Sequence, residues 1–356
     1  MFQTIISTIS SFMYSKLLVI LLIGAGVYFT VRTRFPQVRL FKNACGSVME
    51  KPEDKGAISS FQALMVSTAS RVGTGNIVGV SSAICIGGFG SVFWMWVIAI
   101  IGGILAVLTG WCLLGGGSRI VKVTSMFVRI FEEAFDFRAI FGAFSGLAMM
   151  QGIRRELYSN EAGIGSAPNA SASANVSHPV KQGLVQMLSV FIDTLLLCTA
   201  TAMMCMSSGI NPAKELQGAL WVQASLQESL GSLGPVFITV AMVFFAFTTL
   251  LGNCFYCDNL LIYIHKKQPE KAFMKGFRLV SALAIFLGAG MEMSLLWDLS
   301  DVLMGVMALI NIPVILILSE IAFKAVQDYE AQLKKGINPV FKSADIGLSQ
   351  KTDFWR

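Results

Sequence analysis

Long apolar runs separated by short polar segments dominate the chain. Seven runs are long enough to cross a hydrocarbon core of about 30 Å, and they cover residues 17–31, 61–86, 91–114, 184–209, 235–257, 278–296 and 299–320. A weaker run, 139–153, continues into polar sequence. The pattern predicts an all-α integral membrane protein, with one transmembrane domain over residues 1–321 that has about eight membrane segments.

Composition excludes an ordinary soluble domain. Hydrophobic residues make up 54% of the chain, charged residues only 13%, and the mean hydropathy is +0.68. The first run lacks a small-residue cleavage site, so we expect a retained helix rather than a signal peptide.

The net charge of +6 does not change this interpretation. The cations gather in short segments beside the runs, at residues 32–55, 119–129, 265–278 and from 324 onward. The positive-inside rule then predicts that these segments and the polar tail, 322–356, are cytoplasmic. We therefore expect a multi-pass protein of the plasma (cell inner) membrane, with the lipid bilayer as its partner and no nucleic acid.

No enzyme chemistry stands out. The seven cysteines lie mostly within apolar runs and form no disulfide framework, and Cys254-Phe-Tyr-Cys257 has neither a second pair nor a histidine cluster nearby. The chain also lacks a nucleophile and base in any recognisable arrangement. We expect no catalytic residue and no cofactor.

Two polar, glycine-rich stretches interrupt the apolar pattern. They are "STASRVGTGN" (67–76) and "LYSNEAGIGSAPNASASAN" (157–175). The first lacks the lysine of a phosphate-binding loop, and Gly75-x-x-x-Gly79 has the spacing of close helix packing. Two glycines flanking Thr74 favour a broken helix instead, since each costs about 1 kcal/mol in a helix interior.

Broken helices free backbone amides and carbonyls inside the membrane. Such groups are tolerated only where they line a cavity or bind something, and half-helix ends suit an amino-acid carboxylate and a coupling cation. Charged residues within spans are also costly. Arg71 and Glu161 could form a gating pair or a structural pair, and Asp193 could be an ion relay or a hydrogen-bonded structural group.

Several segments resemble the alanine or glycine:cation symporter family. They are "VGTGNIVGVSSAICIGG", "VFWMW", "SNEAGIGSAP", "HPVKQGLVQMLSVFIDTLLLCTAT", "FFAFTTLLGN" and "LWDLSDVLMGVMALIN". The resemblance implies a leucine-transporter-like inverted-repeat helical bundle with broken helices. It also implies sodium-coupled symport of a small neutral amino acid, alanine or glycine, by alternating access.

The resemblance also implies the site residues. Those expected to bind substrate are Gly73, Thr74, Gly75, Asn76, Asn160, Glu161, Ala162, Gly163, Gly165 and Ser166. Those expected to bind Na⁺, as coupling ion, are Ala69, Val72, Thr248 and Thr249, and oxygen ligands suit a hard cation. The alternative for the two threonines is a hydrogen bond to the preceding helical turn.

The chain departs from the family pattern in two ways. Glu156 stands where the family usually has glycine, Phe89 where it has proline, and Cys257 where it has glycine.

The chain is also shorter in its interior than the family pattern. The resemblance and the cytoplasmic loops together predict that residues 114–140 cross the membrane an odd number of times. This interval contains no apolar run long enough to cross it. The bundle that the resemblance implies has ten core helices in two repeats of five. The sequences expected for its third and fifth core helices are absent, so the predicted bundle is incomplete. The alternatives are a truncated, transport-inactive relative or an ion channel, and an oligomer could supply the missing walls.

Overall fold

The structure is a computed structural model that describes residues 2–52, 54, 57–101, 117–134 and 143–348. Parts of three predicted segments lie outside these ranges: residues 102–114 of the third apolar run, 139–142 of the weak run, and 349–356 of the tail.

The regular elements of the described part are helices, in agreement with the all-α prediction. They are α1 (Phe2–Phe12), η1 (Met13–Leu17), α2 (Leu18–Arg32), α3 (Pro36–Arg39), α4 (Phe41–Val48), α5 (Ser60–Arg71), η2 (Gly75–Gly79), α6 (Val80–Gly87), α7 (Gly90–Ile101), α9 (Gly117–Ala134), α11 (Ala143–Asn160), α12 (Ala167–Ser171), α13 (Pro179–Phe191), η3 (Ile192–Cys198), α14 (Thr199–Ser207), η4 (Lys214–Leu216), α15 (Ala219–Leu230), α16 (Leu233–His265), α17 (Lys271–Ala289), α18 (Met293–Ile317), α19 (Ser319–Lys334) and η5 (Ser343–Ile346).

Five helical stretches are long and apolar enough to cross a membrane. They are Gln3–Arg32, Pro179–Ser207, Leu233–His265, Lys271–Ala289 and Met293–Ile317, and two shorter apolar helices are Gly75–Gly87 and Gly90–Ala99. The prediction of a multi-helix membrane protein is confirmed.

One predicted boundary is wrong. The apolar run 278–296 is not one helix, because α17 ends at Ala289 and α18 begins at Met293. Helix α17 also starts earlier, at Lys271, so that Lys275 and Arg278 lie in the helix rather than in a loop. Long basic side chains reach from a helix end toward the polar interface, which lets a helix extend past its apolar window.

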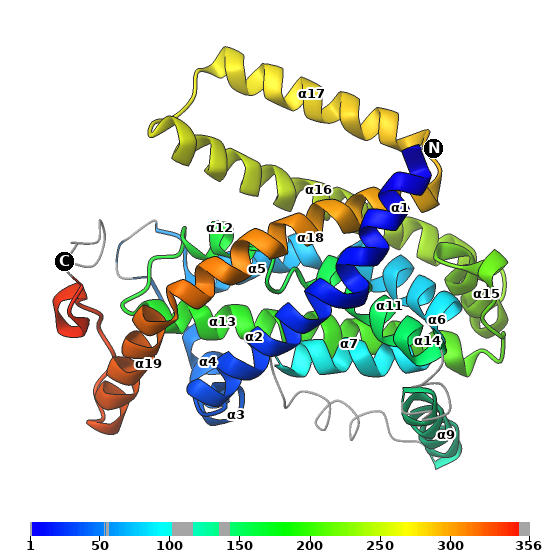
Figure 1. Ribbon diagram of the computed structural model, residues 1–356, viewed down its shortest axis with the longest axis horizontal. Coiled ribbons are helices and arrows are strands. Elements are labelled where there is room, and N and C mark those ends of the chain that lie inside the picture. Colours follow the sequence, from blue (N-terminus) through cyan, green and yellow to red (C-terminus); the bar gives the residue numbers. More distant parts are fainter. Residues whose placement is uncertain (1, 53, 55–56, 102–116, 135–142, 349–356) are drawn as a thin grey trace.

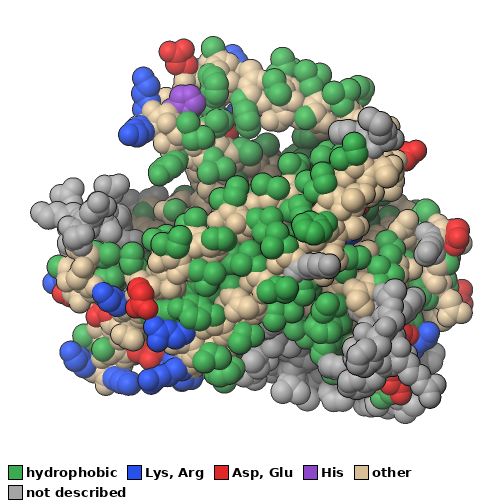
Figure 2. Space-filling model, in the orientation of Figure 1, with side chains coloured by type: hydrophobic (Ala, Val, Ile, Leu, Met, Phe, Trp, Pro, Cys, Tyr) green, Lys and Arg blue, Asp and Glu red, His purple; other side chains and the backbone are tan. Residues whose placement is uncertain are grey.

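The helices form a tight central group with one projecting hairpin (Figure 1). Helix α11 packs against α7 and α6, and α18 packs against α1 and α2. The main apolar core includes the fully buried Phe191 and Trp221. The hairpin of α16 and α17 extends away from this group (Figure 1), and apolar side chains cover much of the visible face (Figure 2).

Helix α19 and the segment after it fold back onto the rest of the chain. Helix α19 runs through "QDYEAQLK" and ends before Gly336, which has φ +72°. Lys181 is buried, with only 2% of its surface exposed. Its ammonium group donates to Glu50 at 2.6 Å and to Asn338 at 2.7 Å. The His178 ring lies 3.2 Å from Asp328. These contacts fix the tail against the start of α13.

Candidate substrate and cation site

The first predicted break is present, at Val72 and Gly73. Helix α5 ends at Arg71, Val72 is extended (φ −70°, ψ 91°), and η2 begins at Gly75. The Asn76 side chain closes the gap, because its Oδ1 accepts the Gly73 amide at 2.9 Å. An asparagine therefore replaces the helical hydrogen bond at this point.

Asn76 also changes the surroundings of both carbonyls predicted to bind the cation. In a continuous helix the Gly73 amide would donate to the Ala69 carbonyl, but it donates to the Asn76 side chain instead. The Asn76 amide would likewise donate to the Val72 carbonyl, but it donates to the Gly73 carbonyl at 3.3 Å. The carbonyls of Ala69 and Val72 therefore do not accept the hydrogen bonds that a continuous helix would give them from these two amides.

The two predicted threonine ligands differ in their contacts. A Cβ added at Gly73 would collide with Thr249 Oγ1, so α16 lies directly against the first break. Thr249 Oγ1 is buried and has no hydrogen-bond partner among the described residues. Thr248 Oγ1 instead donates to the preceding turn, within 3.1 Å of the Phe244 and Phe245 carbonyls. Thr249 is the better placed oxygen of the pair.

The second predicted break follows α11. Helix α11 ends at Asn160, Glu161 takes the left-handed conformation at φ +56°, and Gly163 and Gly165 have φ +92° and +89°. The chain becomes helical again at Ala167. The Asn160 side chain accepts the Ala162 amide at 2.9 Å, so an asparagine caps this break as well.

Direct contacts join the two breaks. The Ser70 hydroxyl lies 3.2 Å from Glu161 Oε1, and Asn76 Nδ2 donates to the Ser159 hydroxyl at 3.1 Å. A Cβ added at Gly75 would lie 3.4 Å from the Ser159 Cα. The structure thus brings together Gly73 to Asn76 with Asn160 and Glu161, and the Ser166 hydroxyl donates to Glu161.

Gly163 and Gly165 face another element. The Gly163 carbonyl accepts from Asn311 on α18 at 2.9 Å, and a Cβ added at Gly165 would lie 2.8 Å from the Asn311 side chain. These two glycines allow α18 to pack closely.

A buried polar cluster lies behind the breaks, between α11 and η3. Asp193 accepts from Asn76 at 2.7 Å and from Ser159 at 2.8 Å. One turn earlier on α11, Glu156 accepts from Asn160 and Thr194. Both acids are 0% exposed. Each acid therefore holds the asparagine that caps one break.

The open alternatives for the charged residues can now be compared with the structure. Arg71 donates to Ser189 at 2.8 Å, and Glu161 contacts Ser70 and Ser166, so these two do not pair with each other. Asp193 is hydrogen-bonded to neighbouring side chains, as its structural alternative expected.

Sequence reasoning missed Ser70, Ser159, Asn253 and Asn311 as neighbours of the breaks. Asn253 Oδ1 lies 2.9 Å from the Ser70 hydroxyl. The two asparagines each interrupt an apolar run, in "LLGNCF" and "ALINIP". Polar amides within apolar runs were thus the signal that could have identified them.

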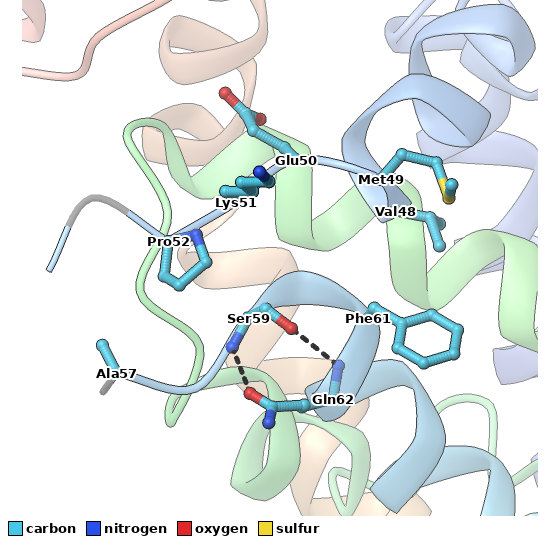
Figure 3. A pocket seen from close by; sticks show the side chains of 9 residues that line it. All are labelled: Val48, Met49, Glu50, Lys51, Pro52, Ala57, Ser59, Phe61 and Gln62. Carbon is cyan, nitrogen blue, oxygen red and sulfur yellow. Dashed lines mark hydrogen bonds between the residues drawn. The ribbon is translucent and has the colours of Figure 1, made fainter. Parts of the chain in front are cut away.

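A surface hollow of about 680 Å³ lies elsewhere, between the end of α4 and the start of α5 (Figure 3). It is lined by residues between Val48 and Gln62, where Ser59 and Gln62 form a reciprocal cap, and by none of the predicted substrate residues. It therefore lies apart from the breaks.

Comparison with known proteins identifies the family to which this chain is similar. The family model described as the sodium:alanine symporter family matches residues 1–108 and 112–343. The amino-acid carrier protein AlsT of Bacillus subtilis is 32% identical, over 99% of this chain and 98% of its own length. The probable sodium/glutamine symporter GlnT of the same organism is 32% identical, over 95% and 93%. The sodium/alanine symporter AgcS of Methanococcus maripaludis is 29% identical, over 93% and 99%.

These comparisons also bear on the predicted internal shortening. The alignment with AlsT extends over 460 positions, whereas this chain has 356 residues, so many positions of the relative have no counterpart here. The family match is interrupted between residues 108 and 112, shortly before the interval 114–140 in which a crossing was predicted to be missing. By the extent of the family match and the likeness to its relatives, the chain is a transporter rather than an enzyme and belongs to the sodium:alanine symporter family.

Proposed function

We propose that this chain carries a small neutral amino acid, alanine or glycine, together with Na⁺ across the plasma membrane. Transport would proceed by alternating access, with Na⁺ and substrate jointly favouring the closed site. The relatives include sodium/alanine and sodium/glutamine symporters. We further propose a leucine-transporter-like bundle with a cytoplasmic tail.

One observation carries the proposal: two helix breaks lie against each other, and a free buried hydroxyl lies against the first of them. Broken helices in contact at mid-membrane are the usual binding site of secondary transporters. Na⁺ would bind the carbonyls of Ala69 and Val72 with the hydroxyl of Thr249, a set of neutral oxygens that suits a hard cation. The substrate would lie between residues 73–76 and 160–166.

Uptake of labelled alanine into liposomes tests the proposal. Purified wild-type chain should accumulate alanine when a Na⁺ gradient is applied and not when choline replaces Na⁺. Thr249→Val keeps the shape of the side chain and removes its oxygen. We expect it to raise the Na⁺ concentration for half-maximal uptake about tenfold, the effect of losing one ligand contact of about 1.4 kcal/mol.

Thr248→Val is the matched control, because Thr248 already bonds to its own helix. It should leave the Na⁺ dependence within about twofold of the wild type. Equal effects of both variants would contradict the assignment of Thr249.

Two other outcomes correspond to the alternative functions. Current without added amino acid would indicate a channel, and no uptake above empty liposomes would indicate an inactive, shortened relative. Unlabelled glycine, serine and glutamine as competitors would define the substrate, because only amino acids that enter the site reduce alanine uptake.

A further inference from the structure

Glu156 is a buried acid that the proposed transport cycle does not use. Its residue is 0% exposed, and it lies on α11 one turn before Asn160. A fully buried acid among membrane helices is costly and needs its own explanation.

The two oxygens of Glu156 have different surroundings. Oε1 accepts hydrogen bonds from Asn160 Nδ2 and Thr194 Oγ1. Oε2 is buried and has no partner among the described residues. An ionised carboxylate with one unsolvated oxygen is therefore much less stable inside a protein than a neutral carboxyl group that lacks one hydrogen bond.

No cation compensates this acid within the described part of the chain. The ion pairs found there include neither Glu156 nor Asp193. Arg155, the next residue to Glu156 in sequence, forms a two-point pair with Asp301 on α18 at 2.9 and 2.7 Å.

The ionisable neighbours of Glu156 are mostly acids. From η3, Asp193 and the Cys198 thiol face it, and Arg71 on α5 acts on Asp193 rather than on Glu156. Helices α7 and η2 carry no ionisable side chain. On the other packed elements Cys85 on α6 contacts Ser81, Arg129 on α9 pairs with Glu133, and Tyr14 on η1 bonds the Asp301 carbonyl. The further acids there are Asp298 on α18 and Glu132 on α9.

We propose that Glu156 is a proton-binding site and that its Oε2 carries the proton in the arrangement seen here. Loss of the proton would add a second negative charge to a buried cluster that already holds Asp193, next in sequence to the Thr194 that bonds Glu156, and nearby like charges repel in such surroundings. The charge would act on Asn160, which caps the second break through the Ala162 amide. Proton release would therefore weaken amino-acid binding.

The link to substrate rests on the proposed function, whereas the proton site itself does not. Infrared spectroscopy of the purified chain without substrate tests the site directly. The wild type should show the C=O stretching band of a protonated carboxyl group at neutral pH, and Glu156→Gln should lose that band.

Glu228→Gln is the matched control, because Glu228 is an exposed acid on α15. It should keep the band. If the wild type and Glu156→Gln show the same absorption in the protonated-carboxyl C=O region from about pH 5 to pH 9, Glu156 stays ionised and the proposal is overturned. If Glu156→Gln does not fold, Glu156→Asp serves for assignment, because the shorter acid should shift the band.

Alanine binding across the same pH range tests the coupling. Affinity of the wild type should fall about tenfold from pH 6 to pH 9, the effect of one unit of pKa coupling. Glu156→Gln should keep the acid-side affinity throughout. A wild-type affinity that does not change with pH would overturn the coupling.

Sodium provides the remaining test. If NaCl removes the carboxyl band at constant pH and choline chloride does not, Glu156 binds Na⁺ in exchange for the proton, and the assignment to a proton alone is overturned. A chain that shows the band and fails to bind alanine would contradict the proposed function while the proton site stands.

Discussion

Two regions of the molecule bury their apolar helices to very different extents. One is the cluster between α11 and η3, and the other is the hairpin of α16 and α17. In the span Pro179–Ser207, which includes η3, 56% of the apolar window is buried, whereas in α17 none of it is. The first region carries two fully buried acids, and the second exposes side chains such as Phe286, 76% exposed. Hydropathy marks both as membrane helices, but only the polar residues distinguish a helix that packs on protein from one that faces its surroundings.

Breaking a buried ion pair between α11 and α18, next to the cluster, and an exposed ion pair on the hairpin should give the largest contrast. Asp301 accepts both Arg155 contacts and lies 3.7 Å from Arg154, and all three side chains are at most 7% exposed. Asp301→Ala would leave buried guanidinium groups without their carboxylate, so we expect a loss of about 3–5 kcal/mol in the free energy of unfolding. Chemical denaturation in detergent micelles measures it.

The matched control lies on the hairpin. Asp258 pairs with Arg278 at 2.9 Å, where the side chains are 29% and 64% exposed. Asp258→Ala should cost at most about 1 kcal/mol, as exposed pairs do. Equal losses for the two variants would mean that the hairpin pair is also buried in the folded protein.

Leucine truncations sharpen the same comparison with a smaller effect. Leu18 is 0% exposed and packs on Gly305 of α18, whereas Leu279 on α17 is 64% exposed. Leu18→Ala should cost about 2–5 kcal/mol because it leaves a cavity. Leu279→Ala should change the free energy of unfolding by less than about 0.5 kcal/mol in detergent. A large loss for Leu279→Ala would show that another protein surface covers α17.

The smallest expected effect is a pH dependence at the start of α13. Burial lowers the pKa of His178 below its ordinary value, and the nearby Asp328 offsets this only in part. The unfolded chain therefore binds this proton more readily than the folded chain. The contribution of His178 to the free energy of unfolding should be largest above about pH 6.5 and should decrease as the pH drops below that value.

Thermal unfolding of the wild type and His178→Gln across about pH 5 to pH 8 checks this. The variant should lose less of its thermal stability on the acid side than the wild type. A wild-type profile that is flat between pH 6.5 and pH 5 would contradict the prediction.

The sequence predicted the membrane class and both breaks well. The glycines around Thr74 and in "SNEAGIGSAP" predicted the breaks, because glycine weakens a helix and allows positive φ. The substrate and cation residues stay predictions, as does the leucine-transporter-like topology. Their neighbours Asn253 and Asn311 come from helices far along the chain, and only the fold shows which amide meets which break.

The sequence also could not show where helix α17 begins or how Glu156 is satisfied. Windows of hydropathy stop at charged residues, yet Lys271 and Lys275 belong to the first turns of α17. In the sequence "RRELYSNEAG", Glu156 has no recognisable partner. In the fold its carboxyl group accepts hydrogen bonds from Asn160, one turn later on α11, and from Thr194 on η3. Both facts depend on the spatial arrangement of segments rather than on local composition.

The folded-back tail sets an order in biosynthesis. His178 and Lys181 meet Asp328 and Asn338, which follow them by 150 and 157 residues. The ribosome completes α13 and several further helices before it makes these partners. That end of the bundle therefore closes only after α19 and the segment behind it have been translated, and until then His178 lacks Asp328 and Lys181 retains only its earlier partners, Glu50 and Ser177.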